Sequence, residues 1–314
     1  MKILYFETKQ EQLYYKEFLN SLKKNHIVYT VKYNNPAQKS EIDCMTKNGE
    51  VDLIVYGYGW VCDGNLDYAM NTILDNPKDI PSILILNKEY KNLDKKLQFI
   101  KQNNIDKVFT PHHKYKEWER ECNVKFYKLP FAANSSIFKN WQVEKKYDLG
   151  FTGNLFNSEY YKSGIMGLEF NNIRERISNE LAKDIYNNLS ICLNGNSYVY
   201  GSDYGKLINS SKIWLCTPSA IQLVGPRFYD IMGSCSLLFC KESDVYDGLF
   251  QPEKHCITFK DNLSDFHEKL FYYLEHDDER NKIIENANNL FLNNHTWDHR
   301  TEQFINDIMG EENV

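Results

Sequence analysis

The chain has 314 residues, of which 42% are hydrophobic and 25% are charged, and its formal net charge is −6 at pH 7. This length accommodates two domains of ordinary size, and the composition excludes a disordered chain. No basic arm or stripe is present, so bulk charge gives no support for nucleic-acid binding. No segment reaches the roughly 20 apolar residues that a membrane span requires.

The eight cysteines are scattered along the chain, and no pair has the C-x-x-C spacing of a redox or zinc motif. Several lie within apolar stretches, where cysteine behaves as a small hydrophobic residue. The apolar run in residues 1–7 is too short for a signal peptide. We therefore expect reduced thiols and a cytoplasmic protein without integral membrane contact.

The first half of the chain alternates short apolar strands with amphipathic helices. The expected strands are Lys2–Phe6, Ile27–Tyr33, Val51–Tyr56, Ser82–Leu86, Lys107–Thr110 and Lys125–Leu129. The expected helices are Gln10–Lys24, Asp67–Leu74 and Asp94–Gln102. This alternation predicts a parallel sheet with helices on both faces, so we expect a Rossmann-like domain over residues 1–140.

The same rhythm restarts after a polar linker at Ser135–Lys146. The expected strands are Tyr147–Thr152, Leu189–Leu193, Ile213–Cys216, Ser236–Cys240 and Cys256–Phe259. The expected helices are Ile173–Asn188, Tyr204–Ser210, Pro226–Gly233, Leu263–Glu275, Asp278–Leu292 and Trp297–Met309. The pattern predicts an α/β protein with two Rossmann-like domains, the second over residues 141–314, that face each other across a cleft.

The short helix at residues 226–233 has polar residues in informative places. Pro226 suits its first turn, where the missing N–H would have no partner in any case. Arg227 follows in that turn, where free backbone N–H groups already favour an anion, and Asp230 comes one turn later. A guanidinium for phosphates and a carboxylate for ribose hydroxyls would together bind a nucleoside diphosphate. The alternative is a surface helix whose Arg and Asp pair in water.

Ligands of open parallel sheets bind beyond the carboxyl ends of the strands. In a two-domain protein of this kind we expect that position to be the cleft. The candidate nucleotide-binding residues that follow strands or begin helices there are Gly153, Asn154, Tyr198, Thr217, Ser219, Arg227, Tyr229 and Asp230.

Residues from about 205 to 305 resemble the C-terminal half of the CgeB-like (spore maturation protein) glycosyltransferases, which have the GT-B fold. The residues that carry the resemblance are Ile208–Ile213, Gly225–Asp230 with Gly233, Leu249–Phe250, Leu270–Leu274, His276–Arg280 and His295–Arg300. Gly150–Asn154 is similar to the opening strand and turn of the family's nucleotide-binding domain, and Leu129–Asn134 is similar to the segment that closes its first domain. The first 125 residues agree only in architecture.

The resemblance implies that Arg227 holds the diphosphate of a nucleotide-sugar donor, that Asp230 holds the ribose, and that the Gly153 turn brings backbone N–H groups to phosphate. Related retaining enzymes carry Glu eight positions before the ribose-binding acid, where this chain has Gln222. Many relatives also have a Gly-rich loop after the first strand, where this chain has Glu7–Lys9. Gln222 leaves the stereochemical course open, and Glu7–Lys9 leaves the acceptor side open.

A transferase of this fold meets the charge of the leaving diphosphate with side chains and helix termini, so the resemblance implies no required metal. An inverting enzyme also needs a base, and Asp63, after the strongest strand, and His112, after the fifth, are the candidates. Their alternative is an ordinary loop Asp and a surface His. His112 and His113 are adjacent, which is a poor spacing for two metal ligands on one element.

We therefore expect a metal-independent glycosyltransferase, of hexosyl or pentosyl type, whose co-substrate is a nucleoside-diphosphate sugar and which needs no other cofactor. The second domain would bind the donor and the first the acceptor, which is the hydroxyl of a glycan, a protein or a modified nucleobase. Three alternatives stay open: a nucleotide-sugar epimerase, a non-catalytic nucleotide-sugar-binding subunit, and a phage-type transferase that glycosylates modified DNA bases.

Overall fold

The structure is a computed structural model that describes residues 1–8, 15–32, 39–61, 69, 79–89, 91–153, 173–194, 199–219 and 222–310. The chain divides into two compact units. The first comprises Met1–Pro130 together with Arg300–Val314, and the second comprises Phe131–His299. The sequence alone suggested one boundary after residue 140, whereas the chain passes between the compact units twice.

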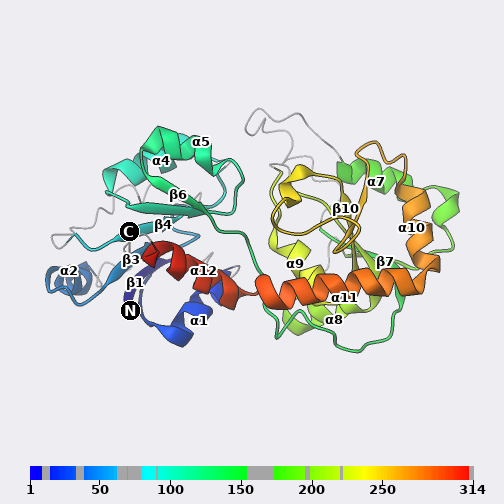
Figure 1. Cartoon of the computed structure of the whole chain (residues 1–314), viewed down its shortest axis with the longest axis horizontal. Helices are drawn as coiled ribbons and strands as arrows, with labels where there is room; N and C mark the ends of the chain where they lie inside the picture. Colours follow the sequence, from blue (N-terminus) through cyan, green and yellow to red (C-terminus); the bar gives the residue numbers. More distant parts are fainter. Residues whose placement is uncertain are drawn as a thin grey trace. The chain divides into compact units, whose positions relative to one another are not determined.

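The first unit contains a parallel sheet of six strands in the order β2-β1-β3-β4-β5-β6 (Figure 1). The strands are β1 (Lys2–Glu7), β2 (Ile27–Lys32), β3 (Leu53–Tyr56), β4 (Ser82–Ile85), β5 (Lys107–Thr110) and β6 (Lys125–Lys128). Each expected strand of this half is present. Strands such as β3 and β4 are buried along their whole length because helices cover both faces of the sheet, so they consist of continuous apolar runs.

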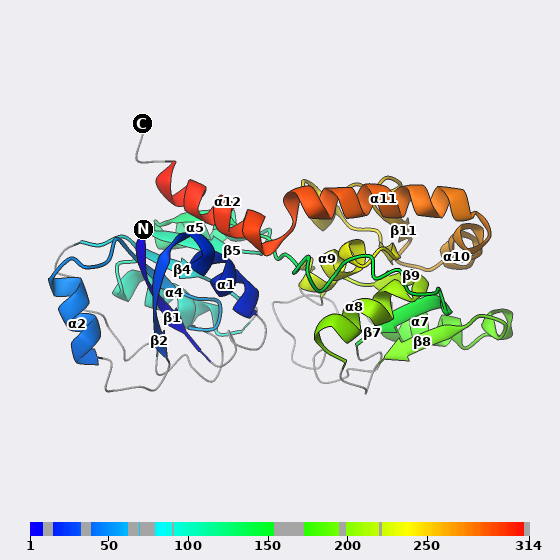
Figure 2. The same cartoon turned by 90° about the horizontal axis from the view of Figure 1, so that it is seen from below.

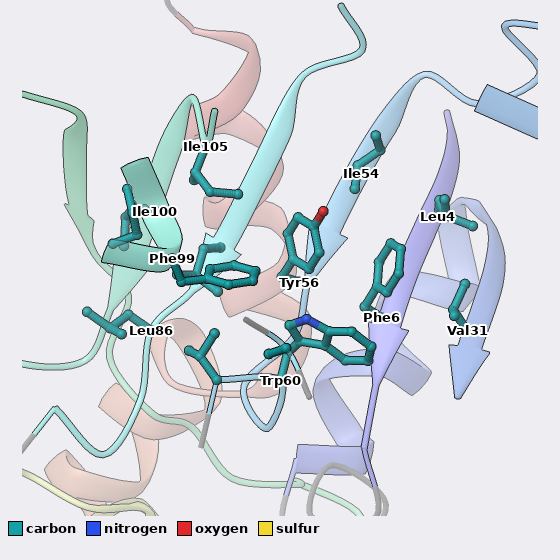
Figure 3. Close-up of a cluster of buried hydrophobic side chains, with 14 of the residues drawn as sticks. Leu4, Phe6, Val31, Ile54, Tyr56, Trp60, Leu86, Phe99, Ile100 and Ile105 are labelled. Carbon is teal, nitrogen blue, oxygen red and sulfur yellow. The ribbon is translucent and has the colours of Figure 1, made fainter. Parts of the chain in front are cut away.

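The helices of the first unit are α1 (Lys16–Asn25), α2 (Lys39–Lys47), α4 (Leu93–Gln102), α5 (Tyr115–Cys122) and the last part of α12 (Trp297–Met309). Helices α4 and α5 lie on one face of the sheet, and α1 and α12 lie on the other (Figure 1). The sequence analysis missed α2 and α5, and the expected helix Asp67–Leu74 falls almost entirely outside the described residues. Figure 3 shows the core beneath α4, where Phe6, Tyr56 and Trp60 pack together.

Helix α12 begins in the second unit and packs on the sheet of the first. The Phe304 ring lies between Phe109 of β5 and Phe18 of α1, with ring centroids 4.6 and 5.5 Å away. The Lys107 ammonium donates a hydrogen bond of 2.8 Å to the Ile308 carbonyl near the end of α12, where the helix dipole favours a cation. Apolar burial and charge therefore both hold the end of the chain on the first unit.

The second unit contains a parallel sheet of five strands in the order β11-β10-β9-β7-β8 (Figure 2). The strands are β7 (Tyr147–Thr152), β8 (Ile191–Asn194), β9 (Ser211–Cys216), β10 (Leu237–Lys241) and β11 (Ile257–Phe259). Its helices are α7 (Ile173–Leu181), α8 (Gly201–Asn209), α9 (Pro226–Gly233), α10 (Phe266–Glu275), α11 (Asp277–Asn294) and the start of α12. Two parallel Rossmann-like sheets are thus present, which confirms the predicted fold class.

Helix α7 is shorter than the sequence suggested, because it ends at Leu181 instead of continuing to Asn188. A 3₁₀ turn at Asp184–Tyr186 follows it. This turn places the Tyr186 ring in the core near Phe266 of α10, with ring centroids 6.5 Å apart, and its hydroxyl donates to Glu180 at 3.0 Å. Burial of the Tyr186 ring therefore stabilises the fold more than continuation of α7 would.

Gly150 of β7 makes room for a tryptophan on the neighbouring strand. It pairs with Trp214 of β9, and a Cβ at this position would lie 2.2 Å from the Trp214 ring. Trp214 is fully buried. The glycine therefore allows β7 and β9 to pair while the large Trp214 ring lies against their backbone.

Candidate functional site

The candidate site of the second unit lies at the carboxyl edge of its sheet, where β7 and β9 are neighbours. From β7 the chain adds β8 on one side, and then returns to add β9, β10 and β11 in turn on the other. The loops that follow β7 and β9 therefore diverge, which is where ligands bind in open parallel sheets. Gly153 follows β7 directly and Thr217 follows β9 directly, so both lie at this switch point.

Helix α9 brings its polar residues to the same edge. Gly225 precedes the helix in an extended conformation, and Pro226 occupies the first position, as predicted. The apolar side chains Phe228 and Met232 are fully buried. Their burial fixes the rotation of the helix and leaves Arg227 and Asp230 only half-buried.

The Gly153 turn lies directly against two guanidinium groups. Its φ is +121°, a backbone conformation that side chains rarely allow. A Cβ on Gly153 would lie 3.3 Å from Nη1 of Arg227 and 3.6 Å from Nη1 of Arg174. The space that the missing side chain leaves therefore faces two cationic groups from two different helices.

Arg174 is a residue that the sequence analysis missed. It lies in the first turn of α7, and its Nε donates a hydrogen bond of 3.0 Å to the Thr217 hydroxyl across the switch point. Its guanidinium also lies over the Phe151 ring, 5.7 Å from the centroid. The positive end of the helix dipole repels a cation in the first turn, and an anion bound beside Arg174 would offset that repulsion. A basic residue in the first turn of a predicted helix was therefore the signal in the sequence for an anion site.

The electrostatics of Arg227 and Asp230 differ from those of a surface ion pair. Within the described part of the chain, neither side chain forms an ion pair within 4 Å. Burial raises the pKa of Asp230 to about 8, against the opposing influence of Arg227. Burial alone would lower the pKa of Arg227, but Tyr204, Cys216 and Asp230 together raise it. At pH 7 the site therefore holds a cationic Arg227 beside a largely protonated Asp230.

Two further side chains complete the surroundings of this pair. Tyr204 of α8 is close enough to Arg227 and Asp230 to interact electrostatically with both, and burial raises its pKa to about 12. Cys216, the last residue of β9, is fully buried, and burial raises the pKa of its thiol to about 12. Both groups are therefore neutral at pH 7, and the sequence analysis named neither as a site residue.

Three of the predicted nucleotide-binding residues lie at the edge of this site or away from it. Thr217 is buried and accepts the hydrogen bond from Arg174. Ser219 lies in a turn, where its hydroxyl accepts from the Leu223 amide at 3.2 Å. The Tyr229 ring is fully buried against His295, with ring centroids 4.8 Å apart, so it serves the core. Asn154 and Tyr198 lie outside the described residues.

Of the two predicted catalytic residues, Asp63 lies outside the described residues and His112 is in the first unit. His112 is buried after β5, with its ring against His113 and Trp118. Its Nδ1 accepts a hydrogen bond of 3.1 Å from the Lys114 amide. A neutral His112 thus carries its proton on Nε2, so in this arrangement it is a hydrogen-bond donor and not a base.

The described residues contain no group of three or more His, Cys, Asp and Glu side chains that could hold a metal ion. Over the same part of the chain, no helix has the length and hydropathy that crossing a bilayer requires.

Comparison with known proteins finds a family match to part of the chain and a fold shared by the whole of it. Residues 155–306 match the sequence profile of a family described as Glycosyl transferase-like. No curated protein sequence matches the chain.

Solved structures match over almost the full length. Sucrose-phosphate synthase from Thermosynechococcus elongatus has a TM-score of 0.62 at 9% identity, with 99% of this chain and 98% of that one covered. HepE from Anabaena, solved in complex with UDP-glucose, has a TM-score of 0.61 at 10% identity, with 99% and 100% covered. A glycosyltransferase from Rickettsia africae has a TM-score of 0.59 at 11% identity, with 100% and 99% covered. These likenesses establish the GT-B fold.

Proposed function

We propose that this protein is a glycosyltransferase that moves a sugar from a nucleoside-diphosphate sugar to an acceptor hydroxyl. The observation that carries the proposal is the approach of Arg174 and Arg227 to the Gly153 turn, at the switch point of the second sheet. The family match over residues 155–306 supports the same chemistry. We also propose that the protein is related to the CgeB-like glycosyltransferases. HepE, which shares the fold, was solved with UDP-glucose, so UDP-glucose is the first donor to test.

In this proposal the two guanidinium groups hold the diphosphate. As the sugar leaves, negative charge grows on the diphosphate, and preorganised cations in a half-buried site lower the energy of that state. Gly153 allows the phosphates to approach the backbone, because no Cβ fills the space between the guanidinium groups. Charge on the leaving group is met without a metal ion.

Asp230 is assigned to the ribose hydroxyls. Because burial raises its pKa to about 8, the carboxyl is mostly protonated at pH 7 and adds little negative charge beside the phosphates. A protonated carboxyl both donates and accepts hydrogen bonds, so it can pair with a ribose hydroxyl in either sense. Thr217 accepts a hydrogen bond from Arg174 and so holds the guanidinium in position for the diphosphate.

The first unit is assigned to the acceptor, and Asp63 remains our candidate for a base there. His112 is assigned as a hydrogen-bond donor to a substrate oxygen, in keeping with the bond that its Nδ1 accepts. We place the enzyme in the cytoplasm, since each cysteine of the described residues is a free thiol.

Donor binding is tested by thermal shift with a panel of nucleoside diphosphates and their sugars, including UDP-glucose. A ligand at 100 times its dissociation constant stabilises the protein by about 2.7 kcal/mol. Arg174→Ala and Arg227→Ala should each abolish the shift. Arg176→Ala is the matched control, because Arg176 lies on the same helix and pairs with Asp261 at 2.9 Å. Wild-type shifts in both site variants would contradict the placement of the donor.

Turnover separates the transferase from its rivals. A transferase releases the nucleoside diphosphate quickly only when an acceptor is present. An epimerase converts the donor sugar with no acceptor, and a non-catalytic subunit binds donor without releasing diphosphate. A transferase that acts on DNA bases would also bind duplex DNA with strong salt dependence.

A further inference from the structure

Two hydroxyl groups next to Arg227 are buried and have no hydrogen-bond partner among the described residues. They belong to Tyr204 of α8 and to Thr152, the last residue of β7. Each oxygen is shielded from solvent. A buried polar atom without a partner is destabilising, so in native proteins such atoms usually bind a water, an ion or a ligand.

The two hydroxyl groups lie close to each other and to the proposed phosphate site. Thr152 lies within hydrogen-bonding reach of Tyr204 and lowers its pKa, and Tyr204 lies within similar reach of Arg227 and raises its pKa, so the three side chains are neighbours. The hydroxyls nevertheless form no hydrogen bond of acceptable geometry with Arg227 or with each other. Thr152 also immediately precedes Gly153, whose open side faces the guanidinium groups.

The Tyr204 hydroxyl keeps its proton at neutral pH, because burial raises its pKa to about 12. It is therefore available as a donor, and Arg227, the charged group that acts on it most strongly, has no acceptor atom to offer it. Asp230 and Cys216 are the other titratable groups that interact with Tyr204, and at pH 7 they are mostly protonated. An anionic oxygen bound here would accept from the Tyr204 hydroxyl and would also pair with the Arg227 guanidinium.

The ring of Tyr204 has a separate, structural role. It packs edge-on against Phe138 at a centroid distance of 5.8 Å and an interplanar angle of 89°. Replacement by phenylalanine keeps this contact and removes only the hydroxyl. The two roles can therefore be separated by one conservative change.

We propose that the Tyr204 and Thr152 hydroxyls donate hydrogen bonds to phosphoryl oxygens of the bound nucleoside diphosphate, beside the guanidinium groups of Arg174 and Arg227. This inference rests on the proposed function, which places the diphosphate at Gly153. It adds two neutral donors from β7 and α8 to the cationic groups on α7 and α9, so that four elements of the second unit hold the same group.

The test measures binding of UDP, GDP, ADP and dTDP to the wild-type chain by calorimetry, and continues with whichever binds most tightly. Hydrogen bonds to charged groups contribute about 1.5–3 kcal/mol, so Tyr204→Phe and Thr152→Val should each weaken binding of that diphosphate by about tenfold or more. Binding of the corresponding nucleoside, measured by competition, should stay within about twofold of wild type. Thr152→Ser should retain wild-type affinity for the diphosphate.

Tyr186→Phe is the matched control, since it removes a tyrosine hydroxyl of the same unit, one that donates to Glu180. It should bind the diphosphate as the wild type does. Wild-type affinity in Tyr204→Phe and Thr152→Val, or an equal loss for nucleoside and diphosphate, would overturn the inference while the proposed function stands. A wild-type chain that binds none of the four diphosphates would overturn both.

Discussion

Substitution of Gly153 by alanine tests the proposed phosphate site with a single carbon atom. The new Cβ would lie 3.3 Å from Nη1 of Arg227 and 3.6 Å from Nη1 of Arg174, in the space assigned to a phosphoryl oxygen. The backbone there has a φ of +121°, so alanine also adds strain on the order of 1–3 kcal/mol. Both effects act against a close approach of phosphate to the backbone.

We expect Gly153→Ala to weaken binding of the donor diphosphate by about 30-fold or more, which corresponds to about 2 kcal/mol. Calorimetry measures the affinity, and urea unfolding measures the strain separately. Gly201→Ala is the matched control, because Gly201 has a φ of +57° with no atom within 4 Å of its added Cβ. It should lose about 1 kcal/mol of stability and no affinity. Equal affinities in Gly153→Ala and wild type would refute the assignment of this space to phosphate.

Three further predictions concern stability. Because burial raises the pKa of Asp230 from 3.8 to about 8, native Asp230 keeps its proton where the unfolded chain loses it, so the free energy of unfolding falls as pH rises between these values. Asp230→Asn should therefore have a free energy of unfolding close to that of the wild type at pH 4 and exceed it by on the order of 5 kcal/mol at pH 8; a difference that is the same at both pH values contradicts this. Phe304→Ala should cost about 3–5 kcal/mol in urea unfolding, since the buried ring lies 4.6 Å from that of Phe109; a loss below about 1 kcal/mol would show that α12 contributes little. Gly150→Ala should prevent folding of the second unit, because its Cβ would meet the Trp214 ring at 2.2 Å, and a wild-type melting temperature would disprove that packing.

The strands were predictable because buried parallel strands leave a continuous apolar signal in the sequence. Leu53–Tyr56 and Leu237–Lys241 are examples in which nearly every residue is buried. The sequence analysis missed helix α2 (Lys39–Lys47), because the helix is short and contributes only two residues, Ile42 and Met45, to the described hydrophobic core. The early end of α7 depends on the burial of Tyr186, which is a tertiary effect and leaves no local signal.

The candidate site was predictable only where it is local in sequence. Gly225, Pro226 and the spacing of Arg227 and Asp230 are encoded within one short helix. Arg174 and Tyr204 come from helices elsewhere in the chain, and they meet Arg227 only because β7 and β9 are neighbours in the sheet. Strand order is a property of the whole fold, so local sequence patterns do not indicate that Arg174 and Tyr204 lie at the site.

The most direct measurement is a crystal structure of the chain with UDP, or with whichever nucleoside diphosphate binds most tightly in calorimetry. Our account predicts density for the diphosphate against the Gly153 turn, with phosphoryl oxygens within hydrogen-bond distance of the Arg174 and Arg227 guanidinium groups and the ribose beside Asp230. A nucleotide bound elsewhere, with Arg174 and Arg227 both free of phosphate, would contradict the central claim.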